Sequence, residues 1–106
     1  LRLDAATATR RYTNPGMHQP GKELVQGMEV VITPDITVDP DEIIAAAMDA
    51  GLAYSEQLTR ETSLVVCNQE GELRGKAMHA HRKGIPLVSD TEFMQLTQNV
   101  RAGTAE

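Results

Sequence analysis

The chain has 106 residues, a formal net charge of −5 and a single cysteine. This length suits one domain with a modest core and leaves little room for two. One cysteine excludes an internal disulfide, and its place in an apolar run indicates a reducing compartment, which we take to be the cytoplasm. No apolar run approaches the roughly 20 residues of a membrane-spanning helix. Because the chain begins with Leu1 instead of methionine, we expect it to be a piece excised from a longer protein.

The charge is divided unevenly along the chain. Residues 1–26 contain four Lys or Arg against two Asp or Glu, a balance of +2, whereas residues 27–106 contain six against thirteen, a balance of −7. An acidic domain repels the phosphate backbone of nucleic acids at long range. The composition therefore argues against a general nucleic-acid binder, and any contact with a phosphate must be local.

Residues 1–26 have the composition of a linker. They show no sustained periodicity and include Pro15, Gly16, Pro20 and Gly21, which are typical of flexible connections. We expect this segment to be a flexible linker or tail, with the alternative that some of it docks on the domain that follows. That domain is expected over residues 27–101, and residues 102–106 are expected to fray.

Regular patterning begins with residues 28–33 (MEVVIT), a β-branched apolar run typical of a buried parallel strand. Asp39 can cap a following helix that has Pro40 at its first position. Gly51 is placed to end this helix, since a glycine readily adopts the left-handed conformation after a last turn. The apolar stripe of the helix consists of Ile43, Ile44, Ala47 and Met48.

The second half of the chain predicts three more strands and two more helices. Short apolar strands are expected at residues 52–54 and 64–67, and a helix is expected at residues 74–83, closed by Gly84. Residues 85–88 (IPLV) read as a fourth strand, and Pro86 favours an edge position or the start of a strand because proline cannot donate to a ladder. Residues 89–92 (SDTE) have the signature of a capping box. The helix that they open is expected to bury Phe93, Leu96 and Val100.

The element order is therefore β-α-β-β-α-β-α, which indicates an α/β domain with a parallel sheet covered on both faces. The second and third strands follow one another with no helix between them. Parallel neighbours need a crossover connection, so we expect these two strands on opposite sides of the first. The predicted fold is a four-stranded parallel sheet in the order 2-1-3-4, with three helices on its two faces.

Several pieces in this order resemble a BRCT domain. They are VVIT with Thr33 at its end, AAAMDAG with its terminal glycine, LTRETSLVVC, and GKAMHAHRKGIPLVSDTEF. The last piece is similar to the BRCT domain of bacterial NAD-dependent DNA ligases. The segment from SLVVCN to GIPLVSD also resembles the C-terminal BRCT module of bacterial DNA polymerase III epsilon-like exonucleases of the DEDD type. The resemblance covers residues 27–100 and implies a binding module without catalytic residues or cofactors.

The resemblance also implies candidate phosphate-binding residues. In BRCT domains that bind phosphate, a Ser or Thr at the end of the first strand, the N–H of the next residue and a Lys at the start of the second helix contact it. The matching positions here are Thr33, Pro34 and Lys76, and Pro34 departs from the family glycine and has no N–H. The missing hydrogen bond to a charged group corresponds to about 1.5–3 kcal/mol, so we expect a weakened site.

Two functions of different class follow from this pattern. The first is a protein-interaction module that tethers its parent within replication or repair assemblies. The alternative is a DNA-binding module that recognises 5′-phosphorylated ends through Thr33 and Lys76, helped by Arg74 and the basic first segment. A third hypothesis is a structural appendage that dimerises the parent.

The remaining reactive residue types have plainer interpretations. Cys67 lies in LVVC and reads as a small core residue, and Thr62 and Ser63 are expected to hydrogen-bond backbone. The cluster Arg74, Lys76, His79, His81, Arg82 and Lys83 reads first as a solvated helix face that complements the helix dipole, with an anion patch as the alternative. Two histidines two residues apart on a helix do not face one another, so we expect no metal site.

Overall fold

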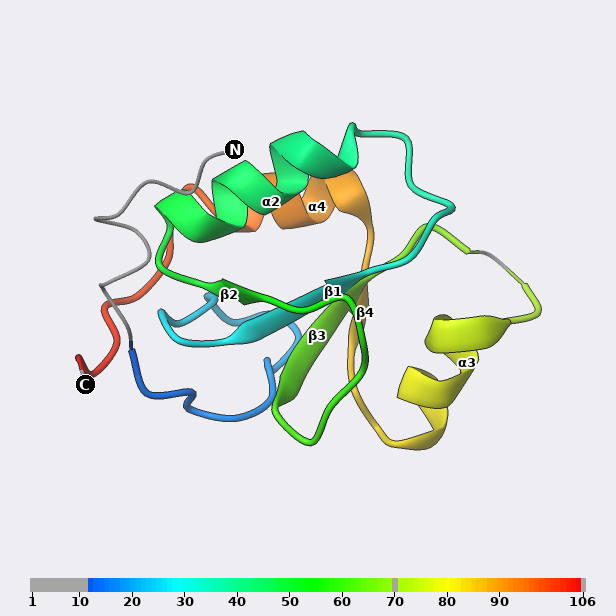
Figure 1. The fold of residues 1–106 in the computed structure, drawn as a ribbon, viewed down its shortest axis with the longest axis horizontal. Helices are drawn as coiled ribbons and strands as arrows, with labels where there is room; N and C mark the ends of the chain where they lie inside the picture. Colours follow the sequence, from blue (N-terminus) through cyan, green and yellow to red (C-terminus); the bar gives the residue numbers. More distant parts are fainter. Residues whose placement is uncertain (1–11, 70, 106) are drawn as a thin grey trace.

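The computed structural model describes residues 12–69 and 71–105, and a parallel sheet forms the centre of this part of the chain (Figure 1). Its strands are β1 (Glu29–Ile32), β2 (Ala53–Tyr54), β3 (Thr62–Val66) and β4 (Leu87–Val88). They lie in the order β2-β1-β3-β4, and every neighbouring pair is parallel. The predicted order is confirmed. The strand that follows Pro86 lies at an edge of the sheet. Pro86 itself directly precedes β4, and its carbonyl accepts a hydrogen bond from the Val65 N–H at 3.0 Å.

Helices α2 (Pro40–Asp49) and α4 (Asp90–Leu96) cover one face of the sheet, and α3 (Gly75–Arg82) covers the other (Figure 1). Asp39 caps α2 by accepting a hydrogen bond from the Asp41 N–H at 2.9 Å. Ser89 caps α4 in the same way through the Glu92 N–H at 3.2 Å. The predicted caps are thus both present. No helix within residues 12–69 and 71–105 is long and apolar enough to cross a membrane.

Alternating side chains of β1 divide the core into two clusters. Val30 and Ile32 point toward α2 and α4, and Val31 points toward α3, as the period of two in a strand requires. Cys67 belongs to the cluster under α3, in agreement with its interpretation as a core residue. The larger cluster contains Leu24, Met28, Val30, Ile32, Ile43, Ala47, Leu52, Leu64, Val66, Val88 and Phe93.

The segment expected to be a flexible linker is packed on the domain over its described part, residues 12–26. Leu24 is 0% exposed and belongs to the larger cluster. The Arg101 N–H donates to the Leu24 carbonyl at 2.8 Å, and the Gln26 N–H donates to the Arg101 carbonyl at 3.0 Å. Docking of part of this segment is the alternative that the sequence left open. The prolines and glycines favour a flexible linker instead, because one buried leucine and a few hydrogen bonds leave no periodic signal. Residues 1–11 of the expected linker lie outside the described residues.

The segment expected to fray, residues 102–106, also makes fixed contacts over residues 102–105. The Gly103 N–H donates to Gln26 Oε1 at 3.0 Å, and the Thr13 N–H donates to the Thr104 carbonyl at 2.8 Å. Tyr12 and Ala105 form an isolated antiparallel bridge. The two ends of the described chain therefore contact one another. Residue 106 lies outside the described part.

Candidate functional site

Thr33 stands at the end of β1, where the sequence predicts a phosphate-binding hydroxyl. Its side chain is buried, with 2% exposed. Its backbone N–H donates to the Val66 carbonyl at 3.0 Å. The hydroxyl makes a hydrogen bond with Asp35 Oδ1 and lies 3.3 Å from the Val66 carbonyl oxygen. A threonine hydroxyl has one proton to donate, and both of these neighbouring oxygens are acceptors for that proton.

The turn after β1 carries a negative charge and lacks one backbone donor. Pro34 is exposed and has no N–H, and the half-buried Asp35 turns its carboxylate toward Thr33. The other oxygen of Asp35 lies 4.0 Å from the Cys67 sulfur. A carboxylate in this position repels an incoming phosphate, which adds to the loss of the N–H. The turn is therefore poorly suited to an anion.

Lys76 and Arg74 lie at the start of α3, as predicted. Lys76 Nζ donates to the Glu56 carbonyl oxygen at 2.5 Å, so its ammonium is held by the connection between β2 and β3. Arg74 precedes α3 as its N-cap residue without a side-chain capping bond, and its backbone N–H donates to Gln69 Oε1 at 2.9 Å. Its guanidinium is exposed and makes no hydrogen bond or ion pair within the described residues.

The exposed face of α3 carries the rest of the basic cluster. His79, His81, Arg82 and Lys83 are all exposed, while Ala77 and Ala80 face the sheet. Three of the basic residues fall in the last turn of the helix, where cations complement the dipole. Among residues 12–69 and 71–105, no group of His, Cys, Asp and Glu side chains is arranged to hold a metal ion.

Asp90 is the residue that sequence reasoning missed. It appeared there only as part of a capping box, yet it is 2% exposed. Its Oδ2 accepts hydrogen bonds from the Thr37 N–H at 2.6 Å, the Thr37 hydroxyl at 2.9 Å and the Val38 N–H at 2.8 Å. Its own N–H donates to Asn68 Oδ1 at 3.0 Å. The Asp90 carboxylate thus connects the β1–α2 loop to the start of α4. The Asp90 backbone N–H connects the β3–α3 loop to the same point.

These contacts lower the pKa of Asp90 far below its usual range. The hydrogen bond from the Val38 N–H contributes most, burial opposes it, and the two bonds from Thr37 and the contact with Asn68 also favour the ionised form. The carboxylate therefore stays charged throughout the physiological range. It fixes the loop that begins at Thr33 and Pro34, which is the loop of the candidate phosphate site.

Ser63 and Thr62 have the backbone role that the sequence indicated. The ladder between β1 and β3 shifts register between Glu29 and Val30. At that irregularity the Ser63 hydroxyl accepts from the Glu29 N–H at 3.1 Å. The Thr62 hydroxyl accepts from the Thr59 N–H at 2.8 Å. The Ser63 hydroxyl thus takes the place of a ladder partner at the irregularity, whereas the Thr62 hydroxyl satisfies a backbone N–H of the connection that precedes β3.

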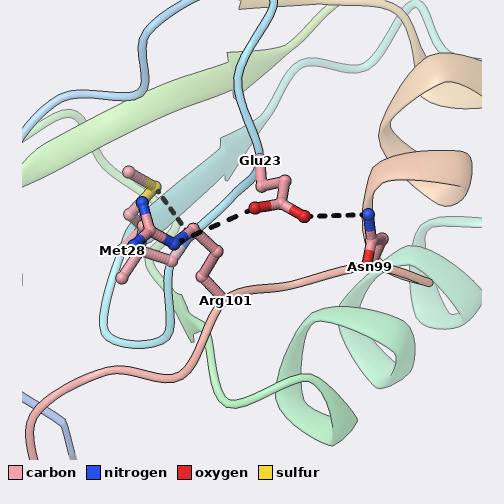
Figure 2. Close-up of polar contacts among 5 residues, drawn as sticks. Glu23, Met28, Asn99 and Arg101 are labelled. Atoms are coloured by element: carbon pink, nitrogen blue, oxygen red, sulfur yellow. Dashed lines mark hydrogen bonds and ion pairs between the residues drawn. The ribbon is translucent and has the colours of Figure 1, made fainter.

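A second candidate surface is built by the docked segment. Figure 2 shows Glu23 between two residues that follow α4: its Oε1 lies 3.9 Å from Arg101 Nε, and its Oε2 accepts from Asn99 Nδ2 at 2.9 Å. The Met28 sulfur accepts from the Val25 N–H at 3.4 Å. Beside them lies an open groove of about 590 Å³, lined by Pro15, Met17, Gln19, Gly21, Lys22, Glu23, Val25, Met28 and Arg101. The side chain of Met17, 49% exposed, lies on its rim.

Comparison with known proteins agrees with this architecture. The model of one protein family, the BRCA1 C Terminus (BRCT) domain, matches residues 20–96. The match begins inside the segment that was expected to be a linker, in agreement with the burial of Leu24. No curated protein and no solved structure matches the chain.

Proposed function

The chain belongs to the BRCT family, and from that premise we propose that it is an interaction module of a DNA replication or repair protein that binds protein partners without requiring a phosphate. Domains of this family are in general non-catalytic and bind proteins or phosphorylated partners. The parent that the sequence resemblance favours is a bacterial 3′–5′ exonuclease of the DNA polymerase III epsilon type, acting in the cytoplasm. The module would tether that parent within its assembly.

The observation that supports this proposal is the hydrogen bond from the Thr33 hydroxyl to the Asp35 carboxylate. A phosphate at this turn would have to displace Asp35 from the hydroxyl and would then lie beside its negative charge. It would also lack the N–H that Pro34 cannot supply. One missing hydrogen bond to a charged group costs about 1.5–3 kcal/mol, which is about 10- to 150-fold in affinity. Both effects support a partner that is recognised without phosphate.

The test compares binding to one partner before and after dephosphorylation. Crosslinking in cells that contain the parent protein identifies partners of this domain, and titration calorimetry then measures the dissociation constant with the purified partner. We expect the same value for the untreated and the phosphatase-treated partner. We also expect the same value for the wild type, Lys76→Ala and the matched control Lys83→Ala, which removes an equal charge at the other end of α3. Loss of binding after phosphatase treatment, or in Lys76→Ala alone, would overturn the proposal.

Recognition of 5′-phosphorylated DNA ends is the second candidate function. It is favoured by the exposed Arg74 guanidinium, which has no partner within the described residues, and by Lys76, whose partner is a backbone carbonyl that can be exchanged. This function predicts binding to a duplex with a recessed 5′-phosphate and not to the same duplex without it. Binding should weaken steeply with salt and disappear in Lys76→Ala. Undiminished binding by that variant would exclude the role.

A further inference from the structure

His18 is buried in a way that leaves one ring nitrogen without a partner. The residue is 4% exposed, and its backbone N–H donates to the Ser63 carbonyl at 3.0 Å. Among the described residues, its Nδ1 is the one buried side-chain nitrogen or oxygen with no hydrogen-bond partner. An unpaired buried N–H is rarer and costlier than an underused acceptor. The neutral ring therefore best leaves Nδ1 unprotonated and carries its proton on Nε2.

A protonated ring does not fit this position. Both nitrogens of a charged imidazole are donors, so Nδ1–H would be buried with no acceptor, in addition to the cost of burying the charge. A buried group of this kind is stable only while it stays neutral.

The charged groups around the ring do not reverse this preference. A cavity of about 360 Å³ adjoins His18, and its charged lining residues are Lys22 and Glu23 from the same segment and Glu92 from α4. The carboxylate of Glu23 is already engaged by Asn99 and Arg101. On the side of β3 the contact of His18 is the bond from its backbone N–H to the carbonyl of the uncharged Ser63. Burial lowers the pKa of His18, and Glu92 offsets only part of that effect.

We propose that His18 is a proton-sensitive latch, which holds residues 13–23 against β3 and α4 while its ring is neutral and releases them when the ring is protonated. Leu24 stays in the core and ends the released segment. Eleven freed residues can span at most about 35–40 Å. Release would therefore lengthen the connection between the domain and the chain on its N-terminal side. It would also remove the groove beside Met17, since most of the lining of that groove belongs to this segment.

The direction with pH follows from the lowered pKa. The released ring has the ordinary value of about 6.5, and the docked ring has a lower one. Docking is therefore strongest above pH 6.5. The equilibrium constant for docking falls about tenfold for each pH unit below 6.5, until the pH reaches the pKa of the docked ring.

The test uses amide hydrogen exchange and ¹H–¹⁵N spectra of the complete chain between pH 5 and pH 7.5. Exchange rates are first corrected for the intrinsic effect of pH. We expect the corrected protection of the His18 and Thr13 amides, which bond to Ser63 and Thr104, to fall at pH 5. The Val65 amide, bonded to Pro86 in the sheet, should stay protected. Equal protection of the His18 amide at both pH values, or simultaneous loss at Val65, would overturn the latch.

Two substitutions separate the latch from a general effect of acid. His18→Phe keeps a ring of similar shape and cannot be protonated, so residues 13–23 should remain docked at pH 5. His79→Phe removes an exposed histidine of α3 and should leave the wild-type pH response intact. If His18→Phe does not fold, His18→Gln takes its place, with the same expected loss of pH response. A pH response that persists in a folded His18 variant would contradict the proposal.

Discussion

The burial of Leu24 gives a direct prediction about where this domain begins. Leu24→Ala removes a side chain that is 0% exposed and packed in the larger core cluster. Truncating a buried leucine leaves a cavity that collapses only in part, and such a change lowers the free energy of unfolding by about 2–5 kcal/mol. The total stability of a domain of this size is on the order of 5–15 kcal/mol. One substitution within the expected linker should therefore remove a large part of it.

Thermal and urea unfolding measure this loss. We expect the midpoint temperature of Leu24→Ala to fall by on the order of 10–20 °C, with an unchanged denaturant m-value. Lys22→Ala is the matched control, because Lys22 is exposed and lies two residues away, and it should unfold like the wild type. If Leu24→Ala lowers the free energy of unfolding by less than about 1 kcal/mol, the size of an ordinary surface effect, this segment is not part of the core.

Three further predictions concern the loops and the turn. Asp90→Asn should lower the midpoint temperature, because an uncharged amide oxygen accepts hydrogen bonds from Thr37 and Val38 more weakly than a carboxylate does. The wild type should also lose stability below about pH 4, where the Asp90 carboxyl of the unfolded chain is protonated and that of the native chain is not. An equal loss of stability in acid by Asp90→Asn would contradict this role of the Asp90 carboxylate. Asp35→Asn should strengthen binding of a 5′-phosphorylated duplex, measured by fluorescence anisotropy, and unchanged binding would mean that the carboxylate is not the obstacle. Gly51→Ala should destabilise α2, as seen by thermal unfolding, since Gly51 has φ +89° and an added Cβ would lie 2.8 Å from Gln26 Nε2; wild-type stability in this variant would refute the cap.

Sequence patterns predicted the sheet and the helices because those features depend on local chemistry. The apolar runs of β1 and β3, the caps Asp39 and Ser89, and the terminal Gly51 each act within a few residues of their position. The placement of β2 and β3 on opposite sides of β1 followed from the absence of a helix between them. The topology was thus available without coordinates.

The missed features depend on partners that are distant along the chain. Asp90 bonds to Thr37 and Val38, which lie 53 and 52 residues away, and no spacing rule connects them. The docking of residues 12–26 rests on Leu24, on backbone bonds, and on side-chain bonds of Glu23 and Gln26 to residues that follow α4, and none of these leaves a local pattern in the sequence. The contact of Asp35 with Thr33 is different, because the two are only two residues apart. The sequence TPD places a carboxylate within reach of the Thr33 hydroxyl, so this contact is accessible to sequence reasoning in the same way as the missing N–H of Pro34.

Amide chemical-shift mapping with a short duplex, with and without a recessed 5′-phosphate and at two salt concentrations, shows whether the turn from Thr33 to Asp35 binds phosphate. We predict no phosphate-dependent shifts at Thr33, Asp35 or residues 74–79 at DNA concentrations up to about millimolar, a level that corresponds to about −4.1 kcal/mol of binding free energy. Saturable shifts at these residues, seen only with the phosphate, would contradict the account and would assign the module to DNA ends.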